Sequence, residues 1–200
     1  MNNSFTEEVD ELEVLNLNDY NLGKLPEFHN LINLKELYCC RNQLTNLPES
    51  IGNLINLQSL SCWNNELTSL PESIGSLINL KKIKCDINQL KSLPNSFKKL
   101  INLESLILDD NLFSSVPNLI NFLTKLRELH ICRNWIFTFN FSSIENLENL
   151  EALYYKPWPY PDSIDNFKKY NITRKNTIKE ILNEQLIIDL DTVSVIFLFC

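Results

Sequence analysis

Glycine, histidine and methionine are scarce in this chain of 200 residues, which has three glycines, two histidines and one methionine. Three glycines are too few for a phosphate-cradling loop, and neither G-x-x-x-x-G-K-[ST] nor G-x-G-x-x-G occurs. Two histidines leave most zinc sites and catalytic triads incomplete. Basic residues are outnumbered 18 to 25, and the formal charge of −7 argues against a nucleic-acid partner. Composition therefore predicts a protein that is not an enzyme, with no cofactor and no metal.

Long apolar runs are also missing. The longest, residues 195–200, has about six residues, against the roughly 20 that a membrane helix needs. The first residues are acidic, whereas a secretory signal begins basic and continues apolar. The six cysteines show no C-x-x-C spacing. We therefore expect a cytoplasmic protein with no membrane partner. We also expect a monomer, with self-association through residues 193–200 as the alternative.

A repeat of 23 residues organises the chain, because asparagines and prolines recur at that spacing. Five copies are in register, and an atypical copy flanks them at each end, with Tyr20 and Trp158 in the place of the asparagine. Modified terminal copies are typical of a stacked array. The aligned residues are Asn42, Asn65, Asn88, Asn111 and Asn134, with Pro48, Pro71, Pro94 and Pro117.

The segments LTNLPESIGNLINL (44–57) and LTSLPESIGSLINL (67–80) resemble the leucine-rich repeat family in its short intracellular form, L-x-x-L-x-L-x-x-N-x-L-x-x-L-P-x-x-I-x-x-L-x-x-L. The resemblance covers residues 12–158, with one extra residue between Phe139 and Ile144. It implies an α/β fold: a right-handed solenoid with a parallel concave sheet and short 3₁₀ or helical convex segments. It also implies a non-enzymatic scaffold for protein–protein interaction.

The residue pattern supports the same fold without the family. Side chains alternate in x-L-x-L-x, so both leucine positions point inward and their neighbours outward, as in a short strand. A stacked asparagine can donate to and accept from turn backbone groups that would otherwise be buried unpaired. The L-P step removes an N–H donor and ends the ladder. Apolar residues three, six and nine positions after each proline then predict a 3₁₀ or helical turn against the core.

The ends of the array need covers. Residues 1–11 are predicted as an N-terminal cap, because Ser4 and Glu7 have capping-box spacing. Residues 12–158 form the solenoid. Residues 159–200 are predicted as a C-terminal capping segment with a helix at 177–187. The tail at 193–200 is a capping strand, an edge that pairs with another chain, or an unstructured end. An adaptor subunit that docks to a larger complex through the C-terminal segment is an alternative function.

The outward side chains of the strands are the candidate binding surface for a protein or peptide partner. They differ from copy to copy while the framework is constant, and they include aromatic residues and arginine, which contribute most to interfaces. Asp86, Asp109 and Asp110 form an acidic patch between these anchors. The remaining candidates are Tyr38, Arg41, Trp63, Lys84, Ile107, His130, Arg133 and Trp135.

The cysteines have two possible roles. Cys39, Cys62 and Cys85 replace the inward leucine of three successive copies, which indicates core packing rather than a metal site or a disulfide. Cys40 and Cys132 are expected to point outward and to be reactive. Cys132 and His130, beside Asp109, hold the parts of a thiol enzyme, which is the alternative from a different functional class. An open sheet lacks the enclosed pocket that such chemistry uses.

Overall fold

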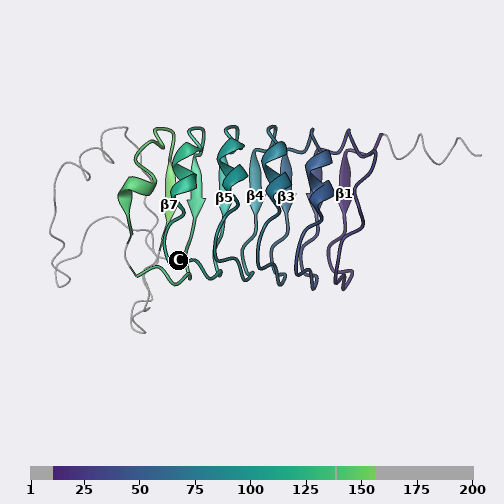
Figure 1. The fold of residues 1–200 in the computed structure, drawn as a ribbon, viewed down its shortest axis with the longest axis horizontal. Helices are drawn as coiled ribbons and strands as arrows, with labels where there is room; N and C mark the ends of the chain where they lie inside the picture. Colours follow the sequence, from purple (N-terminus) through teal and green to yellow (C-terminus); the bar gives the residue numbers. More distant parts are fainter. Residues whose placement is uncertain (1–10, 138, 156–200) are drawn as a thin grey trace, which may run out of the picture.

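The computed structural model describes residues 11–137 and 139–155, which fold into coils stacked side by side. Each coil contributes one strand of three residues to a seven-stranded parallel sheet, in which the strands follow chain order. The strands stand in a row along the long axis (Figure 1). They are β1 (Val14–Asn16), β2 (Glu36–Tyr38), β3 (Ser59–Ser61), β4 (Lys82–Lys84), β5 (Ser105–Ile107), β6 (Glu128–His130) and β7 (Ala152–Tyr154).

Strand pairing confirms the predicted solenoid with its parallel sheet. The central residue of each strand pairs with the central residue of the next, so that Leu60 lies opposite Ile83. The first and last pairings, Val14 with Glu36 and Glu128 with Ala152, join residues 22 and 24 positions apart. The first copy is therefore one residue shorter than the repeat of 23, and the last copy is one residue longer. Both changes in length lie outside the strands, so the strands stay in register.

Short 3₁₀ helices occupy the return leg of the coil, as the sequence predicts. The first four follow a repeat proline, as at Pro71, whose φ of −68° and ψ of 152° are extended. The third residue after each proline, such as Ile74, is buried in the core. Proline fixes φ and cannot donate a ladder bond, so the chain leaves the strand and turns back. The helices are η1 (Glu49–Asn53), η2 (Glu72–Ser76), η3 (Asn95–Lys99), η4 (Asn118–Phe122) and η5 (Phe141–Ser143).

Asn88 shows what the repeat asparagine does. Its Oδ1 accepts the N–H of Leu67 from the preceding coil at 2.9 Å. Its Nδ2 donates to the carbonyl oxygens of Cys62, Cys85 and Asp86 at 3.1, 3.1 and 3.2 Å. One buried amide thus satisfies backbone groups of two coils, as predicted. The same pattern holds at Asn42, Asn65, Asn111 and Asn134.

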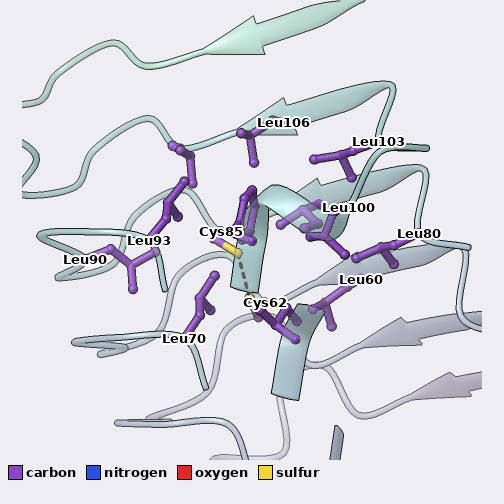
Figure 2. Packing of buried hydrophobic residues seen from close by; sticks show 14 of the residues in the cluster. Leu60, Cys62, Leu70, Leu80, Cys85, Leu90, Leu93, Leu100, Leu103 and Leu106 are labelled. Atoms are coloured by element: carbon purple, nitrogen blue, oxygen red, sulfur yellow. Dashed lines mark hydrogen bonds between the residues drawn. The ribbon is translucent and has the colours of Figure 1, made fainter. Parts of the chain in front are cut away.

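The core is a column of apolar side chains, mostly leucine and isoleucine with Phe28, Phe97 and Phe113, that runs through the stacked coils. Cys39, Cys62 and Cys85 are fully buried in it, which confirms that they replace leucine. Figure 2 shows Cys62 and Cys85 among leucines of several coils, and their sulfur atoms lie 3.2 Å apart as free thiols. The hydrogen bond between Cys62 and Cys85, together with burial, raises the pKa of the Cys62 thiol well above its usual range.

Several predictions lie outside the described residues. These are the N-terminal cap over residues 1–10, the repeat position of Trp158, the capping segment 159–200 with its helix at 177–187, and the tail at 193–200. Within 11–137 and 139–155, no helix has the length and apolar character that crossing a membrane requires.

Candidate functional site

The concave face consists of the side chains that flank the buried central residue of each strand, together with the third residue after that central one. Parallel strands lie about 4.8 Å apart, so side chains at equivalent positions are neighbours across the sheet. Strand β5 is typical, with a buried centre and two half-buried flanks. The face therefore combines residues from coils far apart in sequence. Beyond the flanks, it includes Trp63, Asp86 and Asp109 from three successive coils.

A rim borders the concave face where the strands end. We define it as the residue directly before each repeat asparagine, or before Tyr20 in the first copy. Every rim residue has a left-handed backbone, with φ between 49° and 63°. Asparagine and aspartate tolerate this conformation, whereas other side chains adopt it at a cost. The rim residues are Asp19, Arg41, Asn64, Ile87, Asp110 and Arg133.

The first coils bring two predicted anchors together. Arg41 donates to both carboxylate oxygens of Asp19, at 2.6 and 2.5 Å, and its guanidinium lies 5.0 Å from the centre of the Trp63 ring. Tyr38 donates a hydrogen bond to Glu36 on the same strand. That bond and burial raise the pKa of the Tyr38 hydroxyl. An arginine over an aromatic face is an attractive contact. This contact holds Arg41 of the rim beside Trp63 of the concave face.

Acidic groups gather in the middle of the face, as the sequence predicts. Burial raises the pKa of the Asp86 carboxyl, and the like charges of Asp109 and Asp110 raise it further, whereas the Lys84 ammonium opposes them. Asp110 is paired with Arg133 through two hydrogen bonds of 2.6 Å. The patch therefore contains one carboxylate that is neutralised by an arginine and one, Asp86, that is held beside like charges.

His130 lies between two carboxylates at the far end of the face. Its Nε2 is 3.0 Å from Glu128 and its Nδ1 is 3.5 Å from Asp109, while its ring stacks on Tyr154 with centroids 3.8 Å apart. Burial lowers the pKa of the imidazole, but the hydrogen bonds to both carboxylates raise it more, and the net shift is upward. Burial raises the pKa of Glu128, and its bonds to His130 and Ser105 outweigh this and lower it.

The prediction that Cys40 and Cys132 are reactive was wrong, although both occupy the same repeat position as Trp63, Asp86 and Asp109. Their exposed fractions are 2 % and 0 %, so neither side chain is open to solvent. The Cys40 sulfur packs 3.1 Å from the Ser61 hydroxyl, and burial raises the pKa of its thiol. Asp109 accepts the backbone N–H of Cys132 at 2.6 Å. The geometry thus gives the thiol-enzyme alternative no accessible thiol beside His130.

Two other predicted residues lie at different places. Ile107 is half-buried at the end of β5 and pairs in register with His130, so it belongs to the concave face. Trp135 follows Asn134 and lies in the turn after the rim, with its side chain exposed. Trp135 therefore lies outside the concave face as defined above, and its role in partner binding stays a prediction. The strand alternation that defines the face does not extend past the left-handed rim residue.

Some residues of the face were missed in the sequence. Glu36, Ser105 and Glu128 stand at the first position of their strands, where they bond Tyr38, Glu128 and His130. The same alternation of period two identifies them, because they flank the buried residue on its other side. Ser105 and Glu128 help to line a shallow groove of about 370 Å³ at β5–β7, formed by Glu104, Ser105, Arg127, Glu128, Glu151, Ala152 and Tyr154.

Across the residues that the structure describes, no group of three or more histidine, cysteine, aspartate or glutamate side chains has the arrangement of a metal site. The cluster around His130 instead satisfies its own hydrogen bonds within the sheet. The chemistry that the concave face offers is hydrogen bonding, charge and aromatic contact on an open surface.

Known proteins share this architecture. A family model described as a leucine-rich repeat region matches residues 4–158. A leucine-rich repeat protein of Leptospira interrogans is 32% identical, with a TM-score of 0.60 over 77% of this chain and 46% of that one. A plant peptide hormone receptor, solved in complex with RGF2, is 31% identical, with a TM-score of 0.55 over 64% of this chain and 21% of that one.

An internalin of Listeria monocytogenes, InlF, shares the fold at 21% identity, with a TM-score of 0.61 over 76% of this chain and 42% of its own. No curated protein matches the chain. The chain spans less than half the length of each of these three solved relatives. The family model covers most of the sequence, and the repeat asparagines, strands and 3₁₀ helices explain the match. The chain belongs to the leucine-rich repeat family.

Proposed function

We propose that the concave face binds a protein or peptide partner and that the chain acts as a non-enzymatic interaction module. Leucine-rich repeat regions commonly serve in protein–protein interaction and are typically not enzymes. The plant receptor that this chain resembles was solved with RGF2 bound, which supports a peptide or protein as the kind of partner.

The observation that carries the proposal is the contrast between a constant framework and a variable face. In the five regular coils, the central residue of the strand and the inward residue two positions later are aliphatic or cysteine, and the repeat asparagine is unchanged. The flanking residues on the same strands are tyrosine, serine, lysine, isoleucine and histidine. Folding requires the framework and does not require this variety. Tyrosine, tryptophan and arginine are the residue types that most often anchor interfaces.

Affinity capture from the source cells, quantified by mass spectrometry, tests the proposal. The bait is the full chain, compared with a variant that carries Tyr38→Ala, Trp63→Ala and Tyr154→Ala. A matched control carries Ile55→Ala and Ile78→Ala, which remove exposed apolar side chains from the turns before β3 and β4. We expect a protein that the wild type and the control recover and the concave-face variant loses.

Direct titration with the recovered protein completes the test, because capture alone does not exclude an indirect complex. The concave-face variant should bind at least about tenfold more weakly than the control, which corresponds to about 1.4 kcal/mol. All three baits should have similar melting temperatures. Equal affinity of the concave-face variant and the control would contradict the proposal.

A further inference from the structure

The rim contains one residue that the backbone disfavours. Ile87 has a φ of 53°, and its side chain is 43 % exposed. A β-branched side chain in the left-handed region is a steric outlier. Because the Ile87 side chain is exposed, burial offsets little of this steric cost. The equivalent residue of the preceding coil is Asn64, which suits that conformation. Folding alone therefore favours asparagine at position 87, and the isoleucine calls for another explanation.

Ile87 lies between two ion pairs of the rim. Arg41 and Asp19 form a bidentate pair on one side, and Arg133 and Asp110 form one on the other. Between them the rim offers only Asn64 and Ile87. From Arg41 to Asp110 there are three strand spacings of about 4.8 Å, or about 14 Å, which an extended segment of about four residues spans. The ion pairs thus mark the ends of a short uncharged stretch of rim.

Asp86 stands beside this stretch and differs from its equivalents in other coils. At the same position, Asn18 accepts the N–H of Cys40 at 2.6 Å, and Asp109 accepts the N–H of Cys132 at 2.6 Å. In the described part of the chain, Asp86 forms no ion pair and no side-chain bond to another residue. A half-buried carboxylate that no other residue hydrogen-bonds is unfavourable. Burial accordingly raises the pKa of Asp86, and the bond from its own backbone N–H and the Lys84 ammonium offset this only in part. A cation would relieve this cost.

We propose that Trp63, Asp86 and Ile87 form the docking point of an extended partner segment in which a lysine or arginine lies within two residues of an aliphatic or aromatic side chain. The basic group pairs with Asp86, and the apolar side chain packs on Ile87 and Trp63. Charge complementarity supports this choice of partner, because Asp86 and the neighbouring Asp109 repel an acidic segment. The inference rests on the proposed function and names the chemistry of the segment.

A random dodecapeptide library displayed on phage, selected on the full chain, is the probe. We expect enriched peptides to carry a basic residue next to, or one residue away from, leucine, isoleucine or phenylalanine. Synthetic copies should bind Ile87→Asn and Asp86→Asn at least about tenfold more weakly than the wild type. Ile101→Asn is the matched control, because Ile101 is 54 % exposed in the turn before β5, at the other end of the strands. It should leave binding unchanged.

Thermal unfolding separates recognition from folding. Ile87→Asn should raise the melting temperature, since asparagine fits the left-handed backbone, while it weakens binding. A lower melting temperature would show that Ile87 is a packing residue and would overturn the inference. No enrichment, enrichment of acidic peptides, or equal binding to Ile87→Asn would overturn it as well. Peptides that bind Ile87→Asn normally but lose affinity for Tyr154→Ala would still support the proposed function, whereas peptides indifferent to both changes would contradict it.

Discussion

Asn88→Ala removes one side chain that serves four backbone groups in the middle of the array. Each of the three carbonyl oxygens that it serves keeps a second donor, either a neighbouring repeat asparagine or a backbone amide. The N–H of Leu67 is different. This residue is fully buried, and among the described residues Asn88 is the only acceptor for that N–H. The substitution therefore leaves one buried donor without a partner.

The expected loss follows from that count. An orphaned buried donor costs about 1–3 kcal/mol, and the weakened bonds at the carbonyl oxygens add to it. We expect Asn88→Ala to lower the free energy of unfolding by about 3 kcal/mol. Asn79→Ala is the matched control, because Asn79 is exposed and makes one bond, to the carbonyl oxygen of Ile55 at 2.9 Å. Asn79→Ala should lower the free energy of unfolding by about 0.5 kcal/mol or less.

Urea unfolding followed by circular dichroism measures both variants. With a denaturant slope of about 1–3 kcal/mol per molar urea, the midpoint of Asn88→Ala should fall by about 1–3 M. The midpoint of Asn79→Ala should stay near that of the wild type. If both midpoints shift equally, the buried asparagine is no more important than an exposed one, and the reasoning about the stacked amides fails.

Three further predictions concern the stacking of coils, the charge of the face and the thiols. Gly75→Ala should destabilise the fold by about 1–3 kcal/mol, because a Cβ at this position would lie 2.6 Å from a backbone oxygen of the next coil; Gly23→Ala, with no atom within 4 Å, is the control in the same urea titration. The pKa of His130 is raised in the folded chain, so its contribution to stability is present at low pH and is lost as the pH rises through that value. The stability difference between wild type and His130→Gln should therefore shrink as the pH rises above about 6.5, and a constant difference would show that the imidazolium is not stabilised. Iodoacetamide should leave Cys40 and Cys62 unmodified in the folded chain and label both in urea, as peptide mass spectrometry will show; labelling of the folded chain would contradict their burial.

The fold could be predicted because the sequence repeats its physical requirements in phase. A leucine or cysteine every second residue fixes the inner side of each strand, and the asparagine fixes the turn that follows. The proline fixes the point at which the chain turns back into a 3₁₀ helix. Each requirement is met by residues of one coil, and the same requirement recurs in successive coils of the stack. Even the first copy, which is one residue shorter than the regular repeat, and the last copy, which is one residue longer, keep the register of the sheet.

The site could be predicted only in part, because a repeat position does not show how far neighbouring groups cover a side chain. Cys40 and Cys132 occupy the same repeat position as Trp63, Asp86 and Asp109, yet they are buried. Trp135 lies in the turn beyond the rim, where the alternation of the strand no longer assigns a side chain to a face. The partners of His130 were predicted only in part. The sequence places His130 beside Asp109, but its contact with Glu128 depends on side-chain directions that a linear pattern does not contain.

Hydroxyl-radical footprinting of the chain with its captured partner tests most directly whether the concave face is the binding surface. The account predicts that the partner protects Tyr38, Trp63 and Tyr154 from oxidation. Phe122, exposed at the end of η4, should be oxidised equally with and without the partner. Protection of Phe122, with unchanged oxidation of the three aromatic residues of the sheet, would contradict the account.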